Sequence, residues 1–138
     1  MRPSQILLYV LIGAVGWFVA AQFIRFAGPH IFDGSVAHAA MFVLTALCGP
    51  AFVWLAALAV RLPFGEMLPP ITLMTVTALL LDGIAISWVP FLYGGTGPNL
   101  AYGAAWLLWG VGAIFLAALM LAQRPKTARS SFKNAATH

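Results

Sequence analysis

The stretch ITLMTVTALLLDGIAISWVPFLY, residues 71–93, decides the fold, because it is apolar almost throughout and carries one carboxylate, Asp82, near its centre. At a helical rise of about 1.5 Å per residue, it is long enough to cross a hydrocarbon core about 30 Å thick. A carboxylate near the middle of a bilayer is costly unless a partner compensates it. Residues 71–93 therefore predict a transmembrane helix with a polar centre at Asp82.

The composition of the chain indicates a membrane protein. Of its 138 residues, 62% are hydrophobic and 7% are charged, whereas soluble domains carry about 25% charged residues. Three further apolar stretches have the length of a membrane span, at residues 5–27, 36–60 and 100–122. The connections between the spans are short, so consecutive helices must be antiparallel. We therefore expect an all-α fold, a polytopic four-helix bundle that occupies residues 1–122.

The basic residues predict how the bundle is oriented. Arg2 precedes the first span, Arg61 follows the second, and four more basic residues lie in residues 123–138. All three regions fall on one side, which the positive-inside rule makes cytoplasmic together with both termini. We expect residues 123–138 to be a disordered basic tail that fixes topology or attracts lipid headgroups, and not a nucleic-acid site. The first apolar stretch is longer than the core of a signal peptide, so we interpret it as an uncleaved span.

Cysteine and histidine usage argues against redox, metal and haem chemistry. Cys48 is the single cysteine, which excludes a paired-cysteine oxidoreductase. His30, Asp33 and His38 lie close together in sequence, but their spacing matches no compact ligand motif. We predict no metal and no cofactor, and we expect Asp33 or Ser35 to cap the second helix.

Polar side chains inside three of the spans predict a common polar centre. Thr75 and Asp82 share one face of the third span, Thr45 lies in the second, and Gln22 and Arg25 are one turn apart in the first. Lipid offers these groups no partner, so we expect them to face the interior of the bundle. Two alternatives stay open: Arg25 forms an ion pair with Asp82, or a protonated Asp82 is hydrogen-bonded to Thr45, Thr75 or the backbone.

Prolines and aromatic residues add further detail to the predicted spans. Pro50 and Pro90 lie in the second and third spans, where each removes a backbone donor and predicts a kink. Tyr102, Trp106 and Trp109 share one face of the fourth span. They either line a pocket for an apolar or cationic ligand or pack in the core.

Residues at the helix ends and small residues within the helices predict the packing. Gly28 and Pro29 are expected to end the first helix, and Trp88 and Tyr93 suit the aromatic belt on the outer side. Small residues four positions apart let helix backbones approach closely. The pairs are Gly16 with Ala20, Gly83 with Ser87, and Ala113 with Ala117.

The second half of the chain resembles a known family. The shared features are LLD in the third span, a proline that closes it, a Pro-Asn pair in the next loop and AWLLW in the fourth span, all within LLLDGIAISWVPFLYGGTGPNLAYGAAWLLWG. With them the chain resembles the bacterial domain-of-unknown-function family 5367, which comprises small four-helix membrane proteins. The first half matches loosely, through an Arg before a Gly in FIRFAG. The resemblance implies a bacterial inner-membrane location and a role for Asp82, Pro90, Asn99 and Trp106, and it supplies no activity.

Three classes of function differ in what the polar centre does. We favour a non-enzymatic membrane protein, an accessory subunit or homo-oligomer, in which Asp82 fixes helix packing within the lipid bilayer. The alternative is a small proton- or cation-coupled transporter that uses Asp82, similar to the small multidrug transporters, although here the acid is in the third helix. An intramembrane enzyme would need a nucleophile and a base at one depth, and Ser87 has no histidine near it in sequence. We therefore predict that the protein is not an enzyme.

Overall fold

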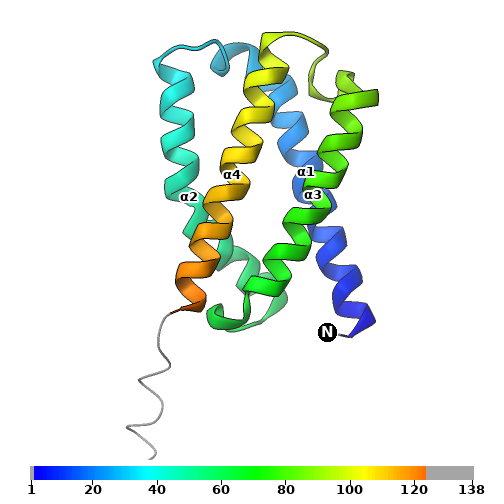
Figure 1. Cartoon of the computed structure of the whole chain (residues 1–138), viewed down its shortest axis with the longest axis vertical. Coiled ribbons are helices and arrows are strands. Elements are labelled where there is room, and N and C mark those ends of the chain that lie inside the picture. Colours follow the sequence, from blue (N-terminus) through cyan, green and yellow to red (C-terminus); the bar gives the residue numbers. More distant parts are fainter. Residues whose placement is uncertain (1, 124–138) are drawn as a thin grey trace, which may run out of the picture.

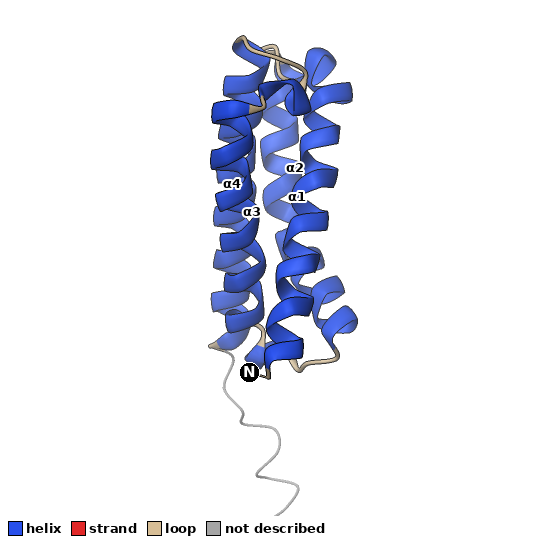
Figure 2. Ribbon diagram, turned by 90° about the vertical axis from the view of Figure 1, so that its right-hand side faces the viewer, coloured by secondary structure: helices blue, strands red, loops and turns tan. Residues whose placement is uncertain are grey.

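The computed structural model describes residues 2–123, and the described chain is almost entirely helical (Figure 1). The elements in order are α1 (Pro3–Ile31), α2 (Val36–Val60), the 3₁₀ turn η1 (Phe64–Glu66), α3 (Leu68–Trp88), the 3₁₀ turn η2 (Pro90–Tyr93) and α4 (Pro98–Ala122). All four α-helices are long and apolar enough to span a membrane. They run along one common axis, and the loops lie at the two ends of the bundle (Figure 2). The predicted all-α four-helix bundle is confirmed, and it indicates a small multi-pass membrane protein.

Consecutive helices alternate in direction, so the start of α1 and the end of α4 lie at the same end of the bundle (Figure 1). Which membrane side this end occupies stays a prediction from the basic residues. The predicted basic tail lies outside the described residues, except for Gln123.

Helix α1 is longer than predicted, because Gly28 and Pro29 lie inside it and the helix ends at Ile31. A proline in a helix frees the carbonyl four residues earlier, here that of Arg25. Gly94 approaches this point so closely that a Cβ on it would lie 3.5 Å from the Arg25 carbonyl oxygen. The loop that follows η2 therefore packs closely against the last turns of α1.

The third span ends earlier than predicted. Helix α3 stops at Trp88, and Pro90 is the first residue of η2, so the predicted kink at Pro90 within a continuous helix is wrong. Val89 still donates to the Ala85 carbonyl at 2.8 Å, but Pro90 has no N–H with which to continue the ladder. Because α3 begins at Leu68 and ends at Trp88, Asp82 lies about 6 Å beyond the middle of the helix, toward η2. Pro50, by contrast, lies within α2.

The helices pack mainly with their second neighbours along the chain: α1 lies chiefly against α3, and α2 chiefly against α4. Glycines permit the closest approaches. A Cβ on Gly13 would collide with the backbone of Met74 in α3, and a Cβ on Gly49 would lie 3.1 Å from the Ala113 carbonyl oxygen in α4.

The small-residue prediction fails at two positions. A Cβ built on Gly16 or on Gly83 would meet nothing within 4 Å, so neither glycine makes a close helix contact. Periodicity identifies the face of a helix that carries small residues, but it does not determine which turn of that face touches a neighbouring helix.

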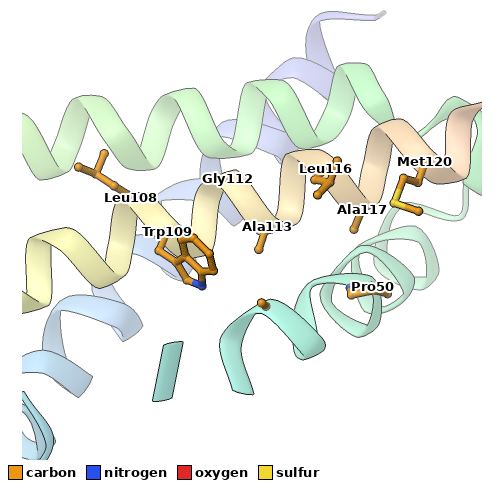
Figure 3. A pocket seen from close by; sticks show the side chains of 9 residues that line it. Pro50, Leu108, Trp109, Gly112, Ala113, Leu116, Ala117 and Met120 are labelled. Atoms are coloured by element: carbon orange, nitrogen blue, oxygen red, sulfur yellow. The ribbon is translucent and has the colours of Figure 1, made fainter. Parts of the chain in front are cut away.

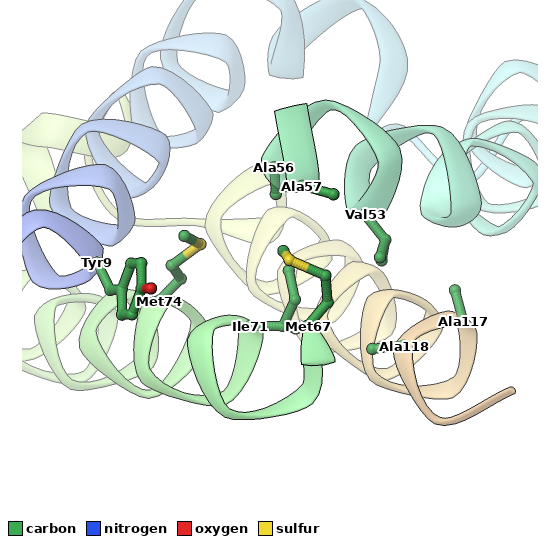
Figure 4. Packing of buried hydrophobic residues seen from close by; sticks show 9 residues of the cluster. All are labelled: Tyr9, Val53, Ala56, Ala57, Met67, Ile71, Met74, Ala117 and Ala118. Atoms are coloured by element: carbon green, nitrogen blue, oxygen red, sulfur yellow. The ribbon is translucent and has the colours of Figure 1, made fainter. Parts of the chain in front are cut away.

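Two hydrophobic clusters form the core of the bundle, one near each end. The first, shown in Figure 4, comprises Tyr9, Val53, Ala56, Ala57, Met67, Ile71, Met74, Ala117 and Ala118. The second comprises Ala21, Ile24, Phe32, Ala85 and Tyr93. Thr45, Thr75 and Asp82, three of the polar residues that the sequence indicated, lie on chain segments between these clusters.

Candidate functional site

A partly open cavity of about 240 Å³ lies between the two clusters, and all four helices line it. Its lining includes Gly16 and Phe52, which are exposed at the surface of the bundle. Glycine and alanine positions such as Gly16, Ala78 and Gly110 leave the space open because they carry little or no side chain. The larger lining residues are Trp17 from α1, Thr45 and Phe52 from α2, Met74, Thr75 and Asp82 from α3, and Trp106 and Ile114 from α4. The structure therefore brings Asp82, Thr45 and Thr75 together around one space, as the polar faces of their helices predicted, and Trp106 from the aromatic face of the fourth span joins them.

Asp82 is held by a chain of hydrogen bonds that joins three elements. The hydroxyl of Tyr93, in η2, donates to Oδ1 of Asp82 in α3. The indole N–H of Trp17, in α1, donates in turn to the Tyr93 hydroxyl oxygen at 2.8 Å. Asp82 is 8% exposed and Tyr93 is 2% exposed, so both side chains are fixed inside the bundle.

The second carboxylate oxygen of Asp82 is not fully buried. The hydrogen bond from Tyr93 uses Oδ1, and among the described residues no fully buried side-chain oxygen or nitrogen lacks a partner. Oδ2 therefore keeps some accessible surface, and Asp82 is one of the residues that line the cavity. Tyr93 thus positions a carboxylate that borders the cavity.

The structure does not bring Arg25 to Asp82. Arg25 is exposed, and its guanidinium carbon lies 5.5 Å from the ring centroid of Phe26, which is itself 70% exposed. Because this part of α1 faces outward, the long side chain extends along the surface of the bundle. Gln22 is half-buried and is not among the residues that line the cavity.

The two threonines are hydrogen-bonded to the backbone rather than to Asp82. The Thr75 hydroxyl donates to the Ile71 carbonyl at 2.8 Å, and the Thr45 hydroxyl donates to the Met41 carbonyl at 2.8 Å. This bonding to the preceding turn is a common use of threonine within helices. Asp82 is hydrogen-bonded, as one of the two alternatives expected, but its partner is Tyr93 and not Thr45 or Thr75.

The three aromatic residues on one face of α4 lie in three different environments. Trp106 lines the central cavity, where its indole N–H donates to the Thr45 hydroxyl oxygen at 2.7 Å. Trp109 is 50% exposed and Tyr102 is 40% exposed. The Tyr102 ring lies edge-on to His38, with the ring centroids 4.8 Å apart. Only Trp106 of the predicted three therefore lines the central cavity.

Trp109 lines a second hollow, a groove of about 360 Å³ between α2 and α4 that also contains Pro50 (Figure 3). Its indole N–H donates to the Phe42 carbonyl at 2.9 Å. Apart from this indole nitrogen, the side chains that line the groove are apolar, among them those of Leu108, Leu116 and Met120. The groove therefore offers a surface for hydrocarbon rather than a chemical centre.

The loop between α1 and α2 forms a helix cap. Ser35 is the N-cap of α2, where its hydroxyl oxygen accepts from the Ala37 amide at 3.2 Å, so the predicted cap is confirmed. Asp33 accepts from the Ser35 amide at 2.9 Å, and hydrogen bonding from Ser35 lowers the pKa of Asp33. His38 Nδ1 accepts from the Gly34 amide at 3.3 Å. Across residues 2–123, no three His, Cys, Asp or Glu side chains group so that they could hold a metal ion.

Tyr93 and Trp17 are the site residues that sequence reasoning missed. Tyr93 was expected in the outer aromatic belt, and this is wrong because the side chain is buried against Asp82. The sequence does contain a signal for this position, since Pro90 is followed by the glycines at 94, 95 and 97. Such a pattern stops a helix and reverses the chain, and the reversal turns Tyr93 back over the end of α3.

Comparison of the chain with protein families, with curated proteins and with solved structures finds no match. The resemblance to family 5367 therefore stays a prediction, and the function has to be argued from the geometry of the site.

Proposed function

We propose that this chain is a non-enzymatic integral membrane protein that binds a small organic cation in its central cavity, with Asp82 as the anionic group. The observation that carries the proposal is the carboxylate of Asp82 in the wall of an otherwise largely apolar and aromatic space. Such a site is what a small proton- or cation-coupled transporter requires, because Asp82 can exchange its bound cation for a proton.

The chemistry of the lining supports a cation with an organic surface. Asp82 supplies a negative charge, and the indoles of Trp17 and Trp106 and the ring of Phe52 supply aromatic surface. Aromatic faces attract organic cations through the ring quadrupole, and this attraction strengthens when water is excluded. A bound cation also supplies the countercharge that a carboxylate within a membrane requires.

The size of the cavity limits the ligand. Its volume of about 240 Å³ is below the range of about 300–1,000 Å³ that is common for sites of drug-sized molecules. The proposed ligand is therefore a small amine or quaternary ammonium ion. The proposal retains the predicted bacterial inner membrane as the location, with both termini in the cytoplasm.

The test is the thermal stability of the purified protein in detergent with benzyltrimethylammonium as the probe. A ligand that binds only the folded state raises stability by about 2.7 kcal/mol at a hundred times its dissociation constant. We expect the probe to raise the Tm of the wild type and of Asp33→Asn, the control at an exposed aspartate outside the cavity. We expect no shift for Asp82→Asn, and none for the wild type with neopentylbenzene, which has the same shape and no charge. Equal shifts for Asp82→Asn and the wild type would exclude the proposed site.

A second function is favoured by the hydrogen-bond chain itself. Because Trp17, Tyr93 and Asp82 join α1, η2 and α3, Asp82 also serves to fix helix packing, as expected for an accessory subunit or homo-oligomer. In that case Asp82→Asn lowers the Tm in the absence of any probe, and the wild type shows no probe-dependent shift. The two readouts, intrinsic Tm and probe-dependent shift, separate the two functions.

A further inference from the structure

Besides the central cavity and the groove beside Trp109, a smaller pocket lies at the end of the bundle where η2 joins α4. It has a volume of about 80 Å³ and is lined by Pro29, Tyr93, the glycines of the connecting loop, Thr96 and Asn99. Backbone amides, a hydroxyl and a side-chain amide give this loop pocket a more polar character than the central cavity. It therefore suits water and hydrated cations.

Tyr93 connects the loop pocket to a residue of the central cavity. It lines the loop pocket, and its hydroxyl is bonded to Asp82, which lines the central cavity. Since Tyr93 is almost completely buried, its ring fills the protein interior between the two. One side chain thus lies between a polar pocket at the end of the bundle and the carboxylate inside it.

The segment that carries Tyr93 is not part of the long helices. It is a single 3₁₀ turn that Val89 separates from α3. Gly94, Gly95 and Gly97 follow it with φ of 95°, 106° and 138°, a region of backbone conformation that L-residues rarely adopt. A Cβ on Gly95 or Gly97 would meet nothing within 4 Å, so space as well as conformation permits rearrangement there.

We propose that Tyr93 gates the central cavity from the loop pocket. With its hydroxyl bonded to Asp82, the passage between the two spaces is closed. When the Tyr93 hydroxyl leaves Asp82, η2 turns on the glycines that follow it, and the passage opens to a small organic cation. The inference rests on the proposed function for the identity of the ligand, whereas the gate itself is tested without ligand binding.

The experiment measures how fast a cysteine in the cavity reacts with a water-soluble thiol reagent. Ala78 lines the central cavity, so Ala78→Cys reports access to it, and Cys48, which is exposed, is replaced by alanine to remove the background. The reagent is 2-(trimethylammonium)ethyl methanethiosulfonate, a membrane-impermeant cation, placed on both sides of proteoliposomes. Combining Tyr93→Phe with Ala78→Cys keeps the ring and removes the hydroxyl. We expect labelling about tenfold faster than in the Tyr93 parent, because the hydrogen bond to the carboxylate is lost.

Tyr102→Phe is the matched control, since Tyr102 lies near the same end of the bundle and lines neither space. It should leave the labelling rate unchanged. Trp17→Phe is a second variant that leaves the Tyr93–Asp82 bond in place and removes the donor to the Tyr93 hydroxyl, and a smaller acceleration is expected. The gate is overturned if Tyr93→Phe and Tyr102→Phe label at the same rate, or if the parent already labels as fast as a cysteine placed in the loop at Thr96.

The labelling and probe experiments can fail separately. Faster labelling in Tyr93→Phe without a probe-dependent Tm shift in the wild type retains the gate and rejects the organic cation. A Tm shift that depends on Asp82, together with equal labelling rates, retains the cation site and rejects Tyr93 as its gate.

Discussion

At the scale of single residues, the centre of this protein is a carboxylate held through one oxygen by the Tyr93 hydroxyl. Tyr93 determines this arrangement, because its hydroxyl occupies Oδ1 of Asp82 and is itself held by Trp17. An acid within a membrane protein is usually satisfied by a cation or by several donors. For Asp82 the donor is Tyr93, with the Trp17 indole behind it, and this pair orients the carboxylate beside the central cavity.

The Tyr93 hydroxyl should contribute measurably to stability. Tyr93→Phe removes two buried hydrogen bonds, and we expect a loss of about 1–2 kcal/mol, since each interhelical bond in a membrane protein contributes about 0.6 kcal/mol on average and up to about 1.7. The measurement is the free energy of unfolding in detergent micelles. Tyr102→Phe, at a partly exposed tyrosine, should change it by less than about 0.5 kcal/mol. Equal effects of the two variants would mean that the Tyr93 bond contributes nothing.

At the scale of elements, the position of Tyr93 depends on where α3 ends. The sequence predicted one helix through residues 71–93, whereas the structure has a helix, a break at Val89 and a 3₁₀ turn. Proline explains the break, and the glycines after Tyr93 explain how the chain turns back. Hydropathy does not detect such a break, because PFLY is as apolar as the helix before it.

Replacing Pro90 should therefore act through Tyr93. Pro90→Ala restores the missing N–H and allows α3 to continue, which rotates Tyr93 away from Asp82. We expect Pro90→Ala to destabilise the protein about as much as Tyr93→Phe. The double variant should be no less stable than either single one, because residues that act through one contact are not additive. A double-mutant cycle of unfolding free energies measures this coupling, and fully additive effects would separate Pro90 from the Tyr93 bond.

Two glycines on α1 should respond in opposite ways to the same substitution. Gly13→Ala places a methyl group against the Met74 backbone and should destabilise the protein by about 1–3 kcal/mol, as overpacking does. Gly16→Ala places the methyl group in the central cavity and should be neutral or stabilise the protein by up to about 1 kcal/mol, because alanine is the better helix former. Thermal unfolding of the two variants decides this. A destabilising Gly16→Ala would show that α1 and its neighbours are closer there than described.

At the scale of the whole molecule, the fold was largely predictable and the site only in part. The length of the apolar spans and the near absence of charge within them predicted four helices. Helix α2 has the predicted bounds of 36–60. Helical periodicity correctly grouped Asp82, Thr45 and Thr75, since polar faces turn inward in lipid. The partner of Asp82 was missed because it comes from a turn, where no periodicity operates. The ion pair of Arg25 with Asp82 was one of two alternatives that the sequence left open, and the end of α1 turns Arg25 outward.

Topology is the prediction that belongs to the whole chain. A fluorescent protein fused after His138 should fluoresce, and alkaline phosphatase fused at the same position should be inactive, because the basic residues predict a cytoplasmic location for this end. Fusion within the loop between η2 and α4 should give the opposite pair of results. The reverse pattern at both positions would invert the bundle and place the loop pocket on the cytoplasmic side.

The pairing of α1 with α3 and of α2 with α4 also determines how the protein can be assembled during synthesis. When the ribosome has delivered the first two helices to the membrane, neither has its main partner, and α1 acquires one only after Leu68–Trp88 has been made. Helices in a membrane insert first and associate afterwards. The first hairpin therefore inserts before either of its helices has its main partner, and truncation before α4 leaves α2 without one.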